Sequence, residues 1–222
     1  MKVVSVIPMK LNNERLPGKN TKEFDDGTPL CNFIFDTVSN IEDIDESYCF
    51  CSNEDIISYL PDKIEFLRRS PELDTPNTSI NDVLRSFIEK VDADIYVLTH
   101  ATSPFIRGET IRKCIEAVVS GKYDSALSVN DVSDFFWSGT TAMNFDPSNI
   151  GRTQDLQKIV RETSGVYVFT KRLFTESNRR VGFNPCFYKI GSIESIDIDY
   201  QEDFIIANAI YTARAHGLDS KD

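Results

Sequence analysis

The chain has 222 residues, of which 41% are apolar, and its formal charge is −11. That apolar fraction is ordinary for a globular protein and supplies a core for one good-sized domain or two small ones. A nucleic-acid binder would show a basic excess or a long basic stripe, and this sequence has neither. The composition therefore predicts that any anionic ligand is met by a local group of cations.

The sequence carries no signal for a membrane or for export. No apolar run approaches the roughly 20 residues that span a bilayer. The opening run at residues 3–7 is too short for a signal-peptide core, and Pro8 closes it. Five cysteines are an odd number, which argues against a secreted disulfide framework. Cys49 and Cys51 lie in a strand-like run, where small core residues are favoured over metal or redox chemistry. We predict a cytoplasmic protein without a membrane anchor.

Short apolar runs alternate with amphipathic stretches, which is the pattern of an α/β domain with a mainly parallel sheet. In chain order, the predicted strands cover residues 3–7, 48–52, 64–67, 94–99, 125–129, 165–170 and 186–190. The predicted helices begin at Thr28-Pro29 with Pro29 in the first position, after a cap at Thr78 or Ser79, at about Glu109, and at Gln201. The last helix is expected to reach His216 and to stop at Gly217. Residues 1–222 contain no evident linker or repeat, so we expect a single domain.

The stretch from residue 132 to residue 156 differs from the rest. It contains the single tryptophan, Trp137, next to the pair Phe135-Phe136, and a turn signal at Asp146-Pro147. We predict irregular strands that project from the main sheet and form a contact in a homodimer.

A basic loop follows the first predicted strand. Residues 8–20 place Lys10, Arg15 and Lys19 at the carboxyl end of that strand, where ligands bind in open α/β sheets. Three cations there can neutralise much of the charge of a triphosphate, about four units. The turn at Pro17-Gly18 would bring Lys19 back over the strand end. The spacing of a Walker A loop is absent, and a solvated surface loop remains an alternative.

Two acids precede the last predicted helix. In extended backbone, Asp197 and Asp199 point the same way, and two carboxylates beside phosphates suit Mg²⁺. The ion would bridge phosphate oxygens. Exposed acids at a strand end are the alternative. Glu202 and Asp203 fall in the first helical turn, where we expect them to interact with the helix dipole.

A turn at residues 101–104 follows the central predicted strand, within the segment 98–105. Small hydroxyl residues such as Thr102, placed at a strand end, can contact a base or a phosphate. A lone histidine, His100, also lies there. For it we favour a structural or neutral base-contacting role over general-base catalysis.

Together and in this order, these segments resemble the cytidylyltransferase family, which includes the CMP-N-acetylneuraminate, CMP-Kdo, CMP-pseudaminate and CMP-legionaminate synthetases. The likeness covers nearly the whole chain. The matching segments are residues 7–20 (I-P-A-R-x-x-S-x-R/G-L-P-G-K-N), 69–73 (R-P-x-x-L), 98–105 (L-L-Q-P-T-S-P-L), 155–167 (R-Q-x-L-P…R-x-N-G-x-x-Y) and 196–203 (I-D-x-x-x-D-F).

The resemblance implies a Rossmann-like sheet of the nucleotide-diphospho-sugar transferase type, with a small dimerisation excursion. It implies attack by the anomeric hydroxyl of an acidic sugar on the α-phosphorus of CTP, with release of pyrophosphate. The residues that it implies for the nucleotide are Lys10, Arg15, Lys19, Asn20, Arg69, Ser79, His100, Ala101 and Thr102. Those that it implies for the sugar are Gln154, Arg161 and Tyr167. Asp197 and Asp199 would bind Mg²⁺, and the catalytic set would be Arg15, Lys19 and Asp199.

This sequence departs from the family pattern at several positions. Lys10 stands where the family usually has arginine, so planar bidentate contact with phosphate is lost. His100-Ala101 replaces Gln-Pro, and Thr163-Ser164 replaces Asn-Gly on the sugar side. We therefore predict transfer from CTP to an acidic 2-keto-3-deoxy sugar, with N-acetylneuraminate as one candidate. The alternatives are a nucleotidyltransferase with another nucleotide or acceptor, and a catalytically silent nucleotide-binding subunit.

Overall fold

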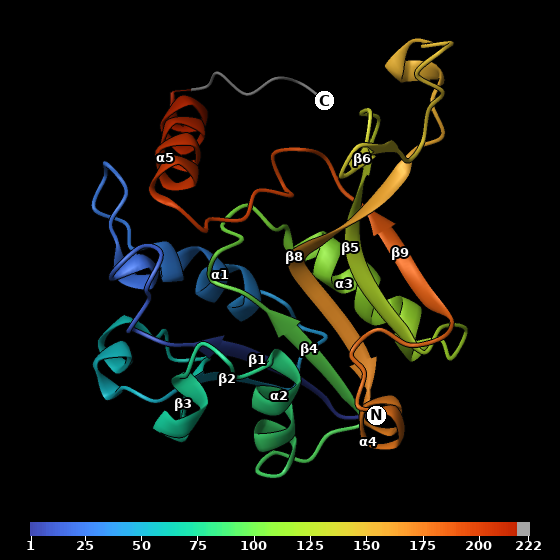
Figure 1. Ribbon diagram of the computed structural model, residues 1–222. Helices are drawn as coiled ribbons and strands as arrows, with labels where there is room; N and C mark the ends of the chain where they lie inside the picture. The colour runs from blue at the N-terminus through green and yellow to red at the C-terminus, as the bar shows by residue number, and fades with distance from the viewer. Residues whose placement is uncertain (217–222) are drawn as a thin grey trace.

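Seven strands form the central sheet of the computed structural model, which describes residues 1–216 of the chain (Figure 1). The strands are β1 (Val3–Met9), β2 (Glu46–Cys51), β3 (Glu65–Arg68), β4 (Ile95–Thr99), β5 (Ser125–Val132), β8 (Ile159–Thr170) and β9 (Pro185–Lys189). Their order in the sheet is β3-β2-β1-β4-β8-β5-β9. Only β8 runs antiparallel to its two neighbours, β4 and β5. The predicted α/β fold with a mainly parallel sheet is confirmed.

Helices cover both faces of the sheet. The helices α1 (Leu30–Ser39) and α3 (Gly108–Val119) pack on one face, whereas α2 (Ile80–Ile88) and α4 (Lys171–Ser177) pack on the other. Consecutive residues of β1 alternate between the two cores, because side chains of a strand point to opposite faces. Burial on both sides explains why the strands are continuous apolar runs.

The cysteines behave as core residues. All five are free thiols, and Cys31, Cys49, Cys51 and Cys114 are buried in the core under α1 and α3. Loss of water around its sulfur raises the pKa of the Cys31 thiol to about 12. Such thiols stay protonated and unreactive at neutral pH.

Several predicted boundaries are corrected. Pro29 is the N-cap of α1 and not its first helical residue, because its ψ of 144° is extended. The third strand begins one residue later than predicted, at Glu65. Helix α4 was not predicted, although Thr170 caps it by accepting a hydrogen bond from the amide of Leu173 at 3.1 Å. The predicted stop of the last helix, Gly217, lies outside the described residues.

Strands β5 and β8 are longer than predicted, because they continue to pair with each other beyond the rest of the sheet. Asn130 lies opposite Arg161, and Val132 lies opposite Ile159. The arm, residues 132–156, leaves from this extension and projects away from the sheet (Figure 1). Its short strands β6 (Trp137–Ser138) and β7 (Thr141–Ala142) pair only with each other. The predicted irregular strands are thus present, and the dimer contact stays a prediction.

The last helix, α5 (Gln201–Ala215), lies beyond the carboxyl ends of the strands and not against the sheet (Figure 1). Phe204 and Ala207 of α5 pack in a third core cluster. The partners of these residues are Leu16, Phe24, Leu30, Phe105 and Ile198. This cluster holds the basic loop, the exit of β4 and the segment before α5 together. Within residues 1–216, no helix has the length and apolar character needed to cross a membrane.

The loop at residues 178–184, between α4 and β9, is fastened to the start of β5. The carboxylate of Asp124 accepts hydrogen bonds from the amides of Phe183 and Asn184, at 2.7 and 3.0 Å. The amide of Gly182 donates to the hydroxyl of Ser125 at 2.8 Å. A Cβ atom on Gly182 would overlap the Asp124 carboxylate.

We predict that Gly182→Ala lowers the free energy of unfolding by about 1–3 kcal/mol, because Asp124 cannot retreat without releasing two backbone amides. Urea unfolding and the melting temperature measure the effect. Gly151→Ala is the control, since a Cβ atom there meets nothing within 4 Å. Equal stability of the two variants would contradict this account of the loop.

Candidate active site

The basic loop folds back over the end of β1. Gly18 has a φ of 67°, in the left-handed region that favours glycine. The amide of Lys19 donates to the carbonyl of Leu16 at 3.1 Å, which closes the predicted turn. Lys19 then begins a short 3-10 helix, Lys19–Thr21, and is only 8% exposed. The turn therefore directs this lysine inward.

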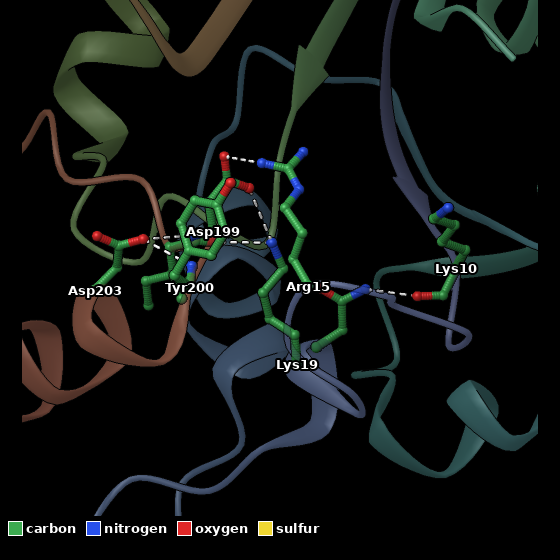
Figure 2. Close-up of polar contacts among 8 residues, drawn as sticks. Lys10, Arg15, Lys19, Asp199, Tyr200 and Asp203 are labelled. Atoms are coloured by element: carbon green, nitrogen blue, oxygen red, sulfur yellow. Dashed lines mark hydrogen bonds and ion pairs between the residues drawn. The ribbon is translucent and has the colours of Figure 1, made fainter. Parts of the chain in front are cut away.

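Lys19 and Arg15 both meet Asp199 (Figure 2). The ammonium of Lys19 donates to the carbonyl of Ile198 at 2.6 Å and lies 3.3 Å from Oδ1 of Asp199. Nη1 of Arg15 lies 2.7 Å from Oδ2 of the same carboxylate. The negative charge of Asp199 raises the pKa of Arg15 above its usual value. Each oxygen of Asp199 thus has a cationic partner.

The backbone of Ile198 is held from both sides. Its amide donates to the carbonyl of Thr102 at 2.8 Å, and its carbonyl accepts from Lys19. Its side chain is fully buried in the third core cluster. Asp197 and Asp199 flank Ile198 in the chain, and the shared direction of their side chains stays a prediction from their spacing. Oδ1 of Asp197 is buried and has no hydrogen-bond partner in the described part of the chain.

Asp203 belongs to the helix start. Its Oδ2 accepts from the amides of Asp199 and Tyr200, at 2.9 and 2.7 Å (Figure 2). Two otherwise unpaired amides are satisfied in this way. Asp203 therefore fixes the path of the chain just after Asp199, and Glu202 is exposed.

Lys10 and Arg69 lie in a second cluster, around Asp74. The ammonium of Lys10 lies well apart from Asp199 (Figure 2) and donates to the carbonyl of Asp74 at 3.3 Å. The amide of Asn20 donates to the carbonyl of Lys10 at 2.9 Å. Arg69, only 4% exposed, pairs with the carboxylate of Asp74. Nε of Arg69 is buried without a hydrogen-bond partner among residues 1–216. Five of the predicted nucleotide residues thus gather in two clusters, with Arg15 and Lys19 near Asp199 and with Lys10, Asn20 and Arg69 near Asp74.

The remaining nucleotide candidates lie at the start of α2 and the exit of β4. The hydroxyl of Ser79 accepts from the amide of Asp82 at 3.2 Å and donates to its carboxylate at 2.6 Å. Ser79 is therefore the predicted cap, and its hydroxyl is engaged in that role. Ala101 is buried, and Thr102 contributes the backbone carbonyl that holds Ile198.

His100 is neutral at physiological pH. The residue is half-buried, and its ring meets that of Tyr167 edge to face, with 6.3 Å between centroids. Loss of water, followed by the positive charges of Arg180 and Lys19, lowers the pKa of His100 to about 4. A neutral imidazole can donate to or accept from a base edge, which agrees with the role favoured for it from the sequence.

A cleft of about 330 Å³ opens between β8, α5 and the segment at residues 192–197. Arg161 and Asp197 both line it. Nε of Arg161 donates to Oδ1 of Asn130 at 2.9 Å, and its Nη2 donates to Oγ of Ser195 at 3.2 Å. Tyr167 is not part of the lining, and its hydroxyl donates at 2.6 Å to Glu162, which is. The exposed Gln154 lies on the arm, outside the lining of the cleft.

Residues 4–218 match the family model described as cytidylyltransferase. The chain belongs to the cytidylyltransferase family. It is 28% identical over 149 residues to N-acylneuraminate cytidylyltransferase A of Danio rerio. The matched region covers 63% of this chain and 34% of the relative. It is 23% identical over 216 residues to N-acylneuraminate cytidylyltransferase of Oncorhynchus mykiss, and this match covers 92% of this chain and 49% of the relative. The chain thus spans half or less of the length of these two relatives.

A third relative is matched along its whole length. CMP-N,N'-diacetyllegionaminic acid synthase of Legionella pneumophila is 27% identical over 244 residues, with 98% of this chain and 100% of the relative covered. Among solved structures, CMP:2-keto-3-deoxy-manno-octonic acid synthetase complexed with CTP has a TM-score of 0.69 at 16% identity, over 96% of this chain and all of the other. A 4-diphosphocytidyl-2C-methyl-D-erythritol synthase from Anaerococcus prevotii has a TM-score of 0.68 at 17% identity, with 95% and 96% covered. Both structures share the fold.

The candidate site contains residues that the sequence did not single out. Asn130 and Ser195 orient Arg161, and Glu162 and Arg180 flank Tyr167. Glu162 lies inside a segment already matched to the family and could have been found there. Arg180 follows a helix that was not predicted and meets Tyr167 only in the folded chain, so no local signal marks it.

We predict that the pKa of His100 makes the fold sensitive to acid. The folded state keeps His100 neutral down to about pH 4, whereas an unfolded histidine binds a proton near pH 6.5. This contribution to stability is complete above pH 6.5 and is lost as pH falls towards 4. His100→Asn should therefore lose less free energy of unfolding than the native chain between those values. Urea titrations across the range measure this, and parallel curves would contradict it.

Proposed function

We propose that this cytidylyltransferase transfers the cytidylyl group of CTP to an acidic 2-keto-3-deoxy sugar and releases pyrophosphate. The observation that carries the proposal is the junction of Arg15, Lys19 and Asp199 beside a cleft that contains Arg161 and Asp197. Cations for a triphosphate and an arginine for a carboxylate meet there at the carboxyl ends of the strands, where ligands of such sheets bind.

The nucleotide is proposed to bind across the two clusters. Arg15 and Lys19 neutralise phosphate charge as it develops during transfer. Because both side chains are already held in position, they lower the free energy of the charged transition state. On the other side, the unpartnered Nε of Arg69 and the neutral ring of His100 offer hydrogen bonds to the nucleoside. Ser79, Asn20, Ala101 and Thr102 would shape that pocket, with Lys10 as a point charge.

A divalent metal is proposed at Asp197 and Asp199. The buried, unpartnered Oδ1 of Asp197 is what a cation would satisfy, since such an oxygen is costly when left alone. Among residues 1–216, no three histidine, cysteine or acidic side chains gather to hold a metal by themselves. One or two carboxylates completed by substrate phosphates suit Mg²⁺. When bound, the ion would offset phosphate charge.

The acceptor is proposed to lie in the cleft with its carboxylate on Arg161. Within residues 1–216, the hydrogen bonds of this side chain use Nε and Nη2, which leaves Nη1 for the sugar. The anomeric oxygen forms a bond to the α-phosphorus while the bond to the pyrophosphate oxygen breaks. The hydroxyl proton passes to a carboxylate, for which Asp199 is the candidate. Tyr167 would act through Glu162, which lines the cleft, and Gln154 would act from the arm, across the proposed homodimer.

The names of the relatives narrow the acceptor class without deciding the sugar. Two are named for N-acylneuraminate and one for N,N'-diacetyllegionaminic acid. These are all acidic nonulosonates, and we propose a member of that class. The neutral His100 and Ala101 replace the Gln-Pro of the family pattern and favour a second candidate function. In it, the protein is a nucleotidyltransferase that binds another base or transfers to a smaller acid.

We expect pyrophosphate release when the protein is incubated with Mg²⁺, CTP and a suitable 2-keto-3-deoxy sugar acid. Each nucleoside triphosphate is tested against a panel of such acids, with EDTA as the metal control. Release with CTP alone among the nucleotides supports the proposal, and release with another nucleotide supports the second candidate. No release with any pairing would exclude transfer to this class of acceptor.

Asp199→Asn should lower kcat by about 100-fold or more, because the side chain loses the charge that orients Arg15 and Lys19 and that would bind the metal. Its melting temperature should stay close to the native value, since this carboxyl group is 40% exposed. Glu202→Gln, an exposed acid in the first turn of α5, is the matched control and should keep its turnover. Turnover that survives in Asp199→Asn would overturn the metal assignment.

A further inference from the structure

Arg180 is held against the acceptor side of the site by two contacts. Its guanidinium carbon lies 4.0 Å from the ring centroid of Tyr167, the distance of a cation–π contact. Its Nη2 lies 3.2 Å from Oε1 of Glu162, the oxygen that also accepts from the hydroxyl of Tyr167. Its side chain is 23% exposed. The guanidinium is thus fixed in place and still reachable from solvent.

Most of the hydrogen-bonding capacity of Arg180 is unused. A guanidinium has five N–H donors in a planar fork. Within residues 1–216, the hydrogen bonds of this side chain involve Nη2 alone. A fixed, partly exposed donor set of this kind is suited to recognise an oxygen atom on a ligand.

Arg180 lies where the nucleotide and acceptor sides of the site meet. Its charge acts on His100 together with that of Lys19, and on Tyr167 together with that of Asp197. Its partner Glu162 lines the same cleft as Asp197. The two halves of the site therefore share this guanidinium as a neighbour.

Two arginines are anchored on opposite sides of one strand. Arg161 and Glu162 are consecutive on β8, so their side chains leave the strand in opposite directions. Arg161 is fixed towards Asn130 and Ser195, whereas Glu162 fixes Arg180 over Tyr167. Arg161 and Glu162 both line the cleft, so an acceptor there lies next to Arg161 and next to the carboxylate that holds Arg180.

We infer that Arg180 determines acceptor specificity by donating to one oxygen of the sugar, a hydroxyl or acyl carbonyl remote from the carboxylate on Arg161. This inference rests on the proposed function. The carboxylate of Glu162 balances the charge of Arg180, so the pair takes a neutral oxygen in preference to a second carboxylate. An acceptor with a methyl group at that point would leave the donors unpaired, which costs binding.

The test is Arg180→Met, which keeps the length of the side chain and removes the donors. With the native acceptor, the KM for the sugar should rise roughly 10- to 100-fold, the effect of losing a charge-assisted hydrogen bond. The KM for CTP should change less than about twofold. A series of acceptors, each lacking one oxygen, then locates the contact. For the single analogue that lacks the contacted oxygen, the native protein and Arg180→Met should have the same KM.

Arg179→Met is the matched control, because Arg179 lies over Phe183 and donates to the carbonyl of Val181. It should leave the KM for the sugar unchanged. Arg180→Lys keeps a charge over Tyr167 and should recover part of the loss, and it replaces the methionine variant if that one does not fold. An unchanged sugar KM, or an equal loss against every analogue, would overturn the inference alone. A native protein without CTP turnover would overturn the proposed function and this inference with it.

Discussion

The site depends on one buried ammonium group. Lys19 donates to the backbone carbonyl of Ile198, 179 positions along the chain, and it does so at 8% exposure. A buried cation is costly unless it is paired and hydrogen-bonded, so this contact specifies a single arrangement of the two segments. The carbonyl of Thr102 holds the same residue from the other side. The basic loop, the exit of the central strand and the acidic segment therefore meet at Ile198.

The chain is acidic overall, but cations are concentrated at the candidate site. The chain carries a formal charge of −11, yet the ends of β1 and β3 present Lys10, Arg15, Lys19 and Arg69 within two small clusters. In each cluster an aspartate, Asp74 or Asp199, holds the cations in position. Phosphate groups would compete with these carboxylates for the cations, and the carboxylate of Asp199 would then be free for a metal.

The antiparallel strand β8 builds the proposed acceptor side of the site. By crossing between β4 and β5 it carries Tyr167 into the core and Arg161 to the cleft. Its extension with β5 forms a wall of the cleft and the base of the arm. The loop at residues 178–184, fastened by Asp124, returns Arg180 to the same strand. The acceptor side is thus made from segments separated along the sequence.

By itself the sequence determined the mainly parallel α/β sheet and the basic loop after the first strand, because each rests on local periodicity or spacing. Most strand positions followed from apolar runs. The Pro29 boundary was misplaced because the ring of proline fixes the same φ in a cap as in the first helical residue, and only ψ distinguishes the two. Only the tertiary structure decided the pairing of Lys19 with Ile198, the neutrality of His100 and the place of Arg180. These depend on burial and on contacts between distant segments, and neither leaves a pattern in neighbouring residues.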